Sequence, residues 1–164
     1  MKILIVDDDP TMYRMYQTIF GMENFEVEVA EDGTSGLEKA KSFGPDLILL
    51  DIMMKTVNGL EVLKKLKADD NLHSIPVVVL SNVSDVTVMN EAKANGAAQY
   101  VVKSNTEPAD MVALVRALLA KLRNNAAAGG APDVPADGMV GGAPADAPAA
   151  PAADPEVMPQ PPLQ

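Results

Sequence analysis

The apolar residues of this chain fall into short runs that are separated by longer amphipathic stretches. The continuous runs at Lys2–Val6, Asp46–Asp51 and Ile75–Leu80 predict strands that are buried on both faces. Phe25–Ala30 alternates apolar and acidic residues, which predicts an edge strand with one wetter face. Tyr100–Val102 predicts a short fifth strand.

Amphipathic stretches with helix start and stop signals follow each of these runs. Asp9 before Pro10 is typical of a helix cap followed by proline in the first turn, whereas Asp32-Gly33 indicates a turn. The helices are expected at about Thr11–Met22, about Ser35–Ser42, at Gly59–Ala68, from a Ser84 cap to about Ala94, and from a Thr106 cap to about Arg123.

Strict alternation of strands and helices predicts an α/β fold in which a five-stranded parallel sheet is doubly wound, with helices on both faces. The patterns that a β-sandwich or a helix bundle would need are missing from the sequence. This domain is expected to span residues 1–123.

The composition changes near Asn124. Residues 124–164 contain 12 Ala, 9 Pro and 5 Gly, few large aliphatic residues and no aromatic ones. Such a segment buries too little apolar area to offset the entropy of ordering it, so an acidic, disordered Ala/Pro/Gly-rich tail is expected.

The charge and composition narrow the classes of function. The net charge is −10, which disfavours binding to nucleic-acid phosphates and to anionic membranes. The chain has no cysteine, which excludes disulfides, zinc–thiolate sites and a cysteine nucleophile. The first apolar run is too short for a signal peptide, and no run is long enough to cross a bilayer, so we expect a cytoplasmic protein.

Polar residues follow four of the five predicted strands. Asp7 and Asp8 follow the first, Asp51 ends the third, Ser81 follows the fourth and Lys103 follows the fifth. Because parallel strands end at one edge of a sheet, where ligands of such folds bind, these side chains are expected to meet.

The residue types at this edge predict the chemistry. Clustered carboxylates repel one another unless a cation neutralises them, and an oxygen-only ligand set suits Mg²⁺ best. A metal beside a lysine, a hydroxyl and an aspartate that can act as the nucleophile indicates phosphoryl transfer.

The motifs ILIVDDD, PDLILLDIMM, VVVLSN and YVVK occur in this order within Met1–Arg123. With these motifs the sequence resembles the receiver domain of bacterial two-component response regulators. The resemblance implies the CheY-like, flavodoxin-like fold, with strand order 2-1-3-4-5. It also implies phosphorelay signalling, in which a histidine kinase or phosphotransfer protein phosphorylates the domain and thereby switches a protein-binding surface.

The resemblance also assigns roles to individual residues. Asp51 matches the phosphoacceptor, Asp8 a direct magnesium ligand, and Asp7 a carboxylate that acts mainly through water, while the backbone carbonyl of Met53 is a further metal ligand. The remaining roles are a phosphoryl contact for Lys103, a hydrogen bond to the phosphoryl group for Ser81, and an aromatic switch for Tyr100.

The sequence departs from the family pattern around the site. The loop after the acceptor usually begins with proline and glycine, but here it reads Lys55-Thr56-Val57-Asn58-Gly59, which adds a cation. Ser104 replaces a proline that usually follows a cis bond, which leaves either a trans bond with a shifted Lys103 or a strained cis bond. Apolar Met53 and Val83 predict a slowly decaying phosphoform, because polar residues there would position the attacking water.

Three other functions are alternatives to this interpretation. Lys55 and Ser104 would suit a degenerate receiver that binds proteins without being phosphorylated. An aspartyl-phosphate phosphohydrolase would need a second acid two residues after the nucleophile, where this chain has Met53, so we do not expect an enzyme. A dinucleotide-binding domain would need glycines where this chain has Asp7-Asp8-Asp9-Pro10. No attached DNA-binding or catalytic domain is expected, so the output would be protein binding or phosphate relay.

Overall fold

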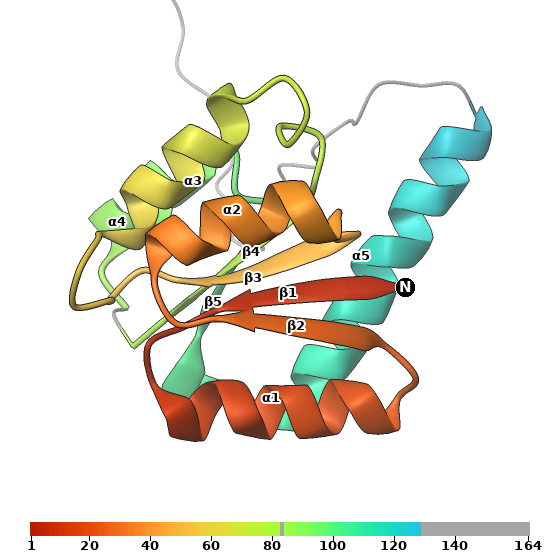
Figure 1. Cartoon of the computed structure of the whole chain (residues 1–164), viewed down its shortest axis with the longest axis horizontal. Helices are drawn as coiled ribbons and strands as arrows, with labels where there is room; N and C mark the ends of the chain where they lie inside the picture. The colour runs from red at the N-terminus through yellow and green to blue at the C-terminus, as the bar shows by residue number, and fades with distance from the viewer. Residues whose placement is uncertain (83, 129–164) are drawn as a thin grey trace, which may run out of the picture. The chain divides into compact units, whose positions relative to one another are not determined.

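A five-stranded parallel sheet forms the centre of the protein. The computed structural model describes residues 1–82 and 84–128, and within them the strand order is β2-β1-β3-β4-β5, as predicted (Figure 1). Edge strand β2 has partly exposed side chains, whereas all residues of the central strands β3 and β4 are buried. The strands are β1 (Lys2–Val6), β2 (Glu26–Ala30), β3 (Leu47–Asp51), β4 (Val77–Ser81) and β5 (Gln99–Val102).

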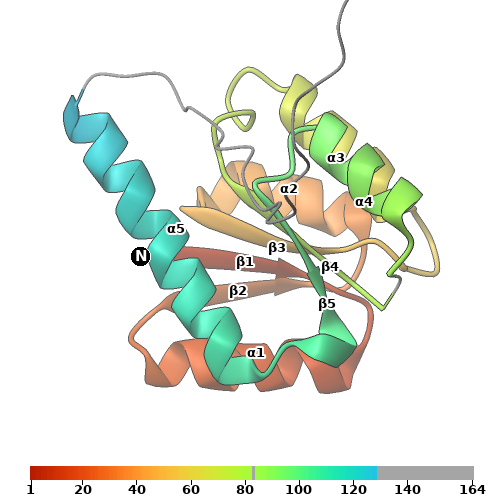
Figure 2. The same cartoon turned by 180° about the vertical axis from the view of Figure 1, so that it is seen from behind.

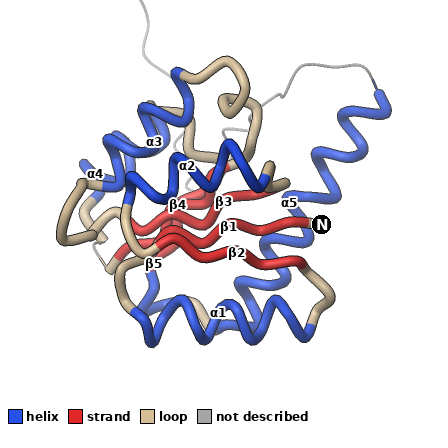
Figure 3. Tube along the Cα trace, viewed as in Figure 1, coloured by secondary structure: helices blue, strands red, loops and turns tan. Residues whose placement is uncertain are grey.

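Five helices cover both faces of the sheet. Figures 1 and 2 show α1 (Pro10–Met22) and α5 (Pro108–Ala128) on one face. On the opposite face lie α2 (Gly33–Phe43), α3 (Gly59–Ala68) and α4 (Val86–Ala94). In the Cα trace every strand is followed by a helix, which is the arrangement that the alternating sequence pattern predicts (Figure 3).

Alternate residues of each central strand contribute to two separate apolar layers. Leu47 and Leu49 of β3 pack with Phe20 and other residues under α1 and α5. Ile48 and Leu50 pack in the other direction, with Leu63 and its neighbours under α2, α3 and α4. This division explains why the central strands are uninterrupted apolar runs, since both of their faces are buried.

Helix starts differ from the predictions at three places. The side chain of Asp32 caps α2, so this helix begins at Gly33, where only a turn was predicted. Asp85, rather than Ser84, caps α4 by accepting a hydrogen bond from the Thr87 amide. Thr106 was expected to cap the last helix, but it ends a short 3₁₀ helix and its hydroxyl donates to the Val102 carbonyl.

The last helix extends five residues beyond its predicted end and reaches Ala128. The added residues include Ala126, Ala127 and Ala128, and alanine is the strongest helix former. Their alanine content is also what made them resemble the Ala/Pro/Gly-rich tail in the sequence. The predicted disordered tail lies, from residue 129 onward, outside the described residues.

The length and apolar character of the described helices bear on whether any of them could cross a lipid bilayer. None of the helices in residues 1–82 and 84–128 combines the length and apolar character needed to cross one.

Candidate functional site

The parallel register brings four strand ends to one edge of the sheet. Val6 of β1 pairs with Leu50 of β3, and Ser81 of β4 pairs with Val102 of β5. Asp51 is the last residue of β3, and its β4 partner is Leu80. The residues at or just after these ends include Asp7, Asp51, Ser81 and Lys103, four of the five residues that the sequence predicted to converge.

Three carboxylates gather at this edge. Asp7, Asp8 and Asp51 each offer one oxygen, and these oxygens lie within 4.8 Å of one another. Asp7 and Asp51 are buried, whereas Asp8 is partly exposed. An all-oxygen set of this kind suits Mg²⁺, which binds carboxylate oxygens and keeps several waters.

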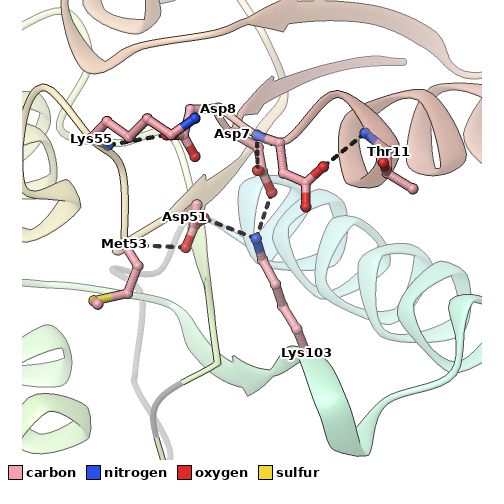
Figure 4. A network of polar contacts seen from close by, with 8 residues as sticks. Asp7, Asp8, Thr11, Asp51, Met53, Lys55 and Lys103 are labelled. Carbon is pink, nitrogen blue, oxygen red and sulfur yellow. Dashed lines mark hydrogen bonds and ion pairs between the residues drawn. The ribbon is translucent and has the colours of Figure 1, made fainter.

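Lys103 lies between two of the carboxylates. Its Nζ donates to Oδ2 of Asp7 at 2.7 Å and to Oδ2 of Asp51 at 2.9 Å (Figure 4). The Lys103 side chain is only 5% exposed, so this ammonium group is a buried counter-charge. Lys103 comes from the end of β5, on the far side of β4 from Asp51.

Burial and pairing shift the pKa values of Asp7 and Lys103. Burial is the largest effect on Asp7 and raises the pKa of its carboxyl, although hydrogen bonds from Lys103 and the Asp9 amide counteract it. Burial acts to lower the pKa of Lys103, but hydrogen bonds and charges of Asp7 and Asp51 together outweigh it and raise that pKa. Repulsion from Asp51 also acts to raise the pKa of Asp7, but it contributes less than burial does.

Each of the three carboxylates also accepts a hydrogen bond from a backbone amide. The Asp9 amide donates to Oδ1 of Asp7 at 2.9 Å, and the Met53 amide donates to Oδ1 of Asp51 at 3.0 Å. These two bonds link residues i and i+2, the Asx turn that aspartate commonly forms at the end of an element.

The third amide bond is of a different kind. The Lys55 amide donates to Oδ2 of Asp8 at 3.0 Å across 47 residues of sequence (Figure 4). Sequence reasoning singled out Lys55 for its charge and missed this role of its amide. No local sequence signal could have revealed a contact between two segments so far apart.

The structure places the two predicted switch residues in the interior. Ser81 is fully buried at the end of β4. Tyr100 of β5 is 9% exposed and belongs to the apolar layer beneath α2, α3 and α4. Met53, whose carbonyl was predicted as a metal ligand, presents an exposed side chain beside Asp51 (Figure 4).

The bond after Lys103 is trans, since the described residues contain no cis peptide bond. Of the two bond geometries that Ser104 left open, the structure therefore has the trans one. Lys103 begins a one-turn 3₁₀ helix, Lys103–Asn105 (η1), and its side chain still reaches both carboxylates.

The loop after Asp51 passes close to the backbone of the site. A side chain on Gly59 would place its Cβ 2.0 Å from the carbonyl oxygen of Asp51, which only glycine avoids. The Gly59 amide donates to the Ile52 carbonyl at 3.0 Å, and the Asn58 side chain caps α3. Both ends of the loop are therefore fixed, although most of its family-like residues are missing.

Two further polar residues have contacts outside this carboxylate cluster. Asp9 caps α1 by accepting a hydrogen bond from the Thr11 amide at 2.8 Å. His73 is exposed, and its Nδ1 is 2.9 Å from the carbonyl oxygen of Asp70 in the loop after α3.

Comparison with known families gives a match over most of the described chain. The family described as the response regulator receiver domain matches residues 3–116.

Curated relatives with this match include two named regulators. The DNA-binding response regulator MtrA of Mycolicibacterium smegmatis is 36% identical over 124 residues, which cover 76% of this chain and 51% of MtrA. The response regulator ArlR of Staphylococcus saprophyticus is 35% identical over 118 residues, or 72% of this chain and 52% of ArlR. The chain thus matches about half the length of these relatives.

Solved structures share the fold. The chemotaxis response regulator CheY4 of Vibrio cholerae superposes with a TM-score of 0.66 and 28% identity, covering 70% of this chain and 95% of CheY4. The BeF3-activated receiver domain of Klebsiella pneumoniae RstA gives 0.67 and 28%, covering 73% and 98%. A CheY-like receiver domain protein of Methanospirillum hungatei gives 0.71 and 25%, covering 76% and 97%.

Proposed function

This chain belongs to the response regulator receiver domain family, and from that premise we propose that it is a phosphorylation-controlled signalling module. Asp51 accepts a phosphoryl group in a Mg²⁺-dependent reaction from a histidine kinase or a phosphotransfer protein. The phosphorylated form then presents a changed surface to an output protein. The process takes place in the cytoplasm.

One observation carries this proposal. The Asp51 carboxylate lies in the same cluster as Asp7, Asp8 and the ammonium group of Lys103. A carboxylate nucleophile beside a cation-binding set and a buried lysine is the combination that transfer of a phosphoryl group needs.

The metal would be held by Asp7, Asp8, Asp51 and the Met53 carbonyl. When bound, Mg²⁺ supplies positive charge that balances the negative charge of the phosphoryl oxygens. The fit rests on the donor set, which contains only oxygens and provides three carboxylates within one small volume.

The nucleophile in the transfer step is a carboxylate oxygen of Asp51. This oxygen forms a bond to phosphorus while the phosphorus–nitrogen bond of the donor phosphohistidine breaks, and the electron pair of that bond returns to the imidazole nitrogen. The product is an acyl phosphate on Asp51. The hydrogen bond from the Met53 amide orients this carboxylate before the reaction.

Lys103 has two carboxylate partners before transfer and exchanges one of them for the phosphoryl group afterwards. Its ammonium group pairs with Asp7 and Asp51 in the present structure. When Asp51 becomes an acyl phosphate, Lys103 follows the negative charge onto a phosphoryl oxygen. Ser81 then donates a hydrogen bond to the phosphoryl group, and Tyr100 changes position in response.

We propose that the domain is not an enzyme acting on external substrates. The second acid that aspartyl-phosphate phosphohydrolases use is replaced by Met53, whose side chain is 61% exposed beside the acceptor. An apolar side chain there does not hold a water in line for attack, so the acyl phosphate decays slowly.

We also propose that the described domain does not itself bind nucleic acid or membranes. Residues 1–123 contain 18 acidic and 13 basic residues, and such a surface repels phosphate groups. The DNA-binding function in the name of MtrA belongs to that protein, of which this chain matches about half.

Intact-mass measurement tests the central chemistry. The chain is incubated with acetyl phosphate and Mg²⁺, alongside the Asp51→Ala variant. A mass gain of one phosphoryl group in the wild type only supports the proposal, whereas an unmodified wild type supports a receiver that binds partners without phosphorylation. Beryllofluoride provides a second probe, because the RstA receiver domain was solved in a BeF3-activated form.

The same sample measures the lifetime of the phosphoform. After removal of acetyl phosphate, the mass gain is expected to persist for many minutes or longer. Decay within seconds contradicts the role given to Met53.

A further inference from the structure

We infer that the backbone amide of Lys55 is a positioning group for Asp8 and thereby sets the affinity of the site for Mg²⁺. This inference rests on the proposed function, because it assumes that the acidic cluster holds the ion. The bond joins the Lys55 amide to Asp8, and it is possible because residue 55 is not a proline and so has an amide hydrogen.

Asp8 is held differently from the other two carboxylates. Asp7 and Asp51 each accept one bond from an amide two residues along the chain and one from the buried ammonium of Lys103. Among the described residues, the only hydrogen bond that Asp8 accepts comes from the Lys55 amide, at 3.0 Å to Oδ2. The orientation of a partly exposed carboxylate therefore depends on one bond from a distant loop.

The loop that carries this amide is fixed at both of its ends. At one end the Met53 amide is bonded to Asp51, and at the other the Gly59 amide is bonded to the Ile52 carbonyl. Gly59 also lies against the backbone of Asp51. The Lys55 amide is thus delivered to Asp8 by a segment anchored on the phosphoacceptor itself.

The consequence for a cation follows from the two oxygens of Asp8. Oδ2 is occupied by the amide, and Oδ1 accepts no hydrogen bond from a described residue. The hydrogen bond to Oδ2 restrains the rotation of the Asp8 carboxylate, and it thereby restrains the direction in which Oδ1 points. Loss of such an outer partner of a metal ligand typically costs about 10–100-fold in metal affinity.

The amide and the side chain of Lys55 have opposite effects on cation binding: the amide favours it and the charged side chain opposes it. The exposed ammonium group makes no ion pair with a described residue, and its positive charge opposes the approach of a cation. Alanine removes only this charge, whereas proline removes both the charge and the amide hydrogen.

The experiment measures metal affinity directly. Free Mn²⁺ is followed by electron paramagnetic resonance during titration of the wild type, Lys55→Ala and Lys55→Pro, and Mg²⁺ affinity is obtained by competition. Lys55→Ala is expected to bind Mg²⁺ as tightly as the wild type or more tightly. Lys55→Pro is expected to bind it about tenfold more weakly than Lys55→Ala.

Equal affinities for the alanine and proline variants overturn the inference and leave the proposed function standing. A wild type that binds neither ion overturns the metal site of the proposed function and this inference with it. The two failures are therefore distinguishable from one set of titrations.

Circular dichroism shows whether Lys55→Pro is folded. If it is misfolded, a second measurement on the wild-type loop tests the inference. Hydrogen exchange of the Lys55 amide is followed by nuclear magnetic resonance in the wild type and in Asp8→Ala. The amide is expected to exchange severalfold faster in Asp8→Ala. Identical rates overturn the inference, because they show that Asp8 does not engage this amide.

Discussion

Single aspartates determine where several helices of this protein begin. Asp32 accepts hydrogen bonds from the Thr34 and Ser35 amides at 2.8 and 2.9 Å, and thereby satisfies amides that have no partner within α2. The sequence identified Asp9 as a cap because proline follows it. It wrongly assigned the α4 cap to Ser84 instead of Asp85, because the two residue types cap helices equally well and differ here only in geometry.

The cap at Asp32 predicts a dependence of stability on pH. The Ser35 amide is the main cause that lowers the pKa of Asp32 below its ordinary value of 3.8. The folded state therefore binds this proton less tightly than the unfolded state. The stabilisation is present above pH 3.8 and is lost as the pH falls through the folded-state pKa.

Asparagine at this position keeps the cap and removes the titration. Asp32→Asn is expected to show a shallower loss of stability between about pH 5 and 2 than the wild type, because its cap does not titrate. Asp32→Ala is expected to lose about 1 kcal/mol at pH 7. Urea unfolding at a series of pH values measures both effects, and an unchanged acid slope in Asp32→Asn would refute the assignment.

At the scale of elements, the loop between β3 and α3 positions the site more than any helix does. It supplies amides to Asp51 and Asp8 and returns to the backbone at Gly59. The sequence predicted α3 to the residue, because its apolar spacing and the preceding Asn58-Gly59 pair are clear. It predicted the convergence at the sheet edge from strand ends alone, but the Lys55–Asp8 bond depends on the folded path of the loop.

Gly59→Ala tests how strictly this loop is held. The new Cβ would meet the carbonyl oxygen of Asp51 at 2.0 Å, so the backbone must move, at a cost of about 2 kcal/mol or more. We also expect weaker Mg²⁺ binding, because the amides of the loop move with it. Gly21→Ala in α1 is the matched control, since no atom lies within 4 Å of its Cβ. It should gain about 0.5–1 kcal/mol. Urea unfolding of both variants distinguishes the effects, and equal stabilities would contradict the close approach.

At the scale of the whole molecule, one sheet is shared by two apolar layers. The order β2-β1-β3-β4-β5 places β1, β3 and β4 in the interior, where both faces are covered. The sequence predicted the parallel sheet and its two helix layers from alternation. The strand order came from the family resemblance, because burial patterns identify the edge strand but do not arrange the central ones.

Shared strands predict that the two layers unfold together. Phe20→Ala removes a fully buried ring beneath α1 and α5, and Leu63→Ala removes a fully buried side chain from the opposite layer. They are expected to cost about 3–5 and 2–5 kcal/mol, respectively. In each variant, far-ultraviolet circular dichroism and tyrosine fluorescence should report one coincident urea transition.

Met22→Ala is the control for these variants, because its side chain is 78% exposed. It should change stability by no more than about 0.5 kcal/mol. Two separated transitions in Phe20→Ala or Leu63→Ala would show that the layers are independent.

The position of Lys103 late in the sequence has a consequence for the order in which the site is completed during synthesis. This lysine closes the acidic cluster from a point 96 residues after Asp7 and 52 residues after Asp51. A nascent chain that has left the ribosome only as far as β4 already carries its carboxylates but lacks their counter-cation. We therefore expect the acidic cluster to gain its counter-charge only when β5 has been made, and a chain that ends before Lys103 to lack it.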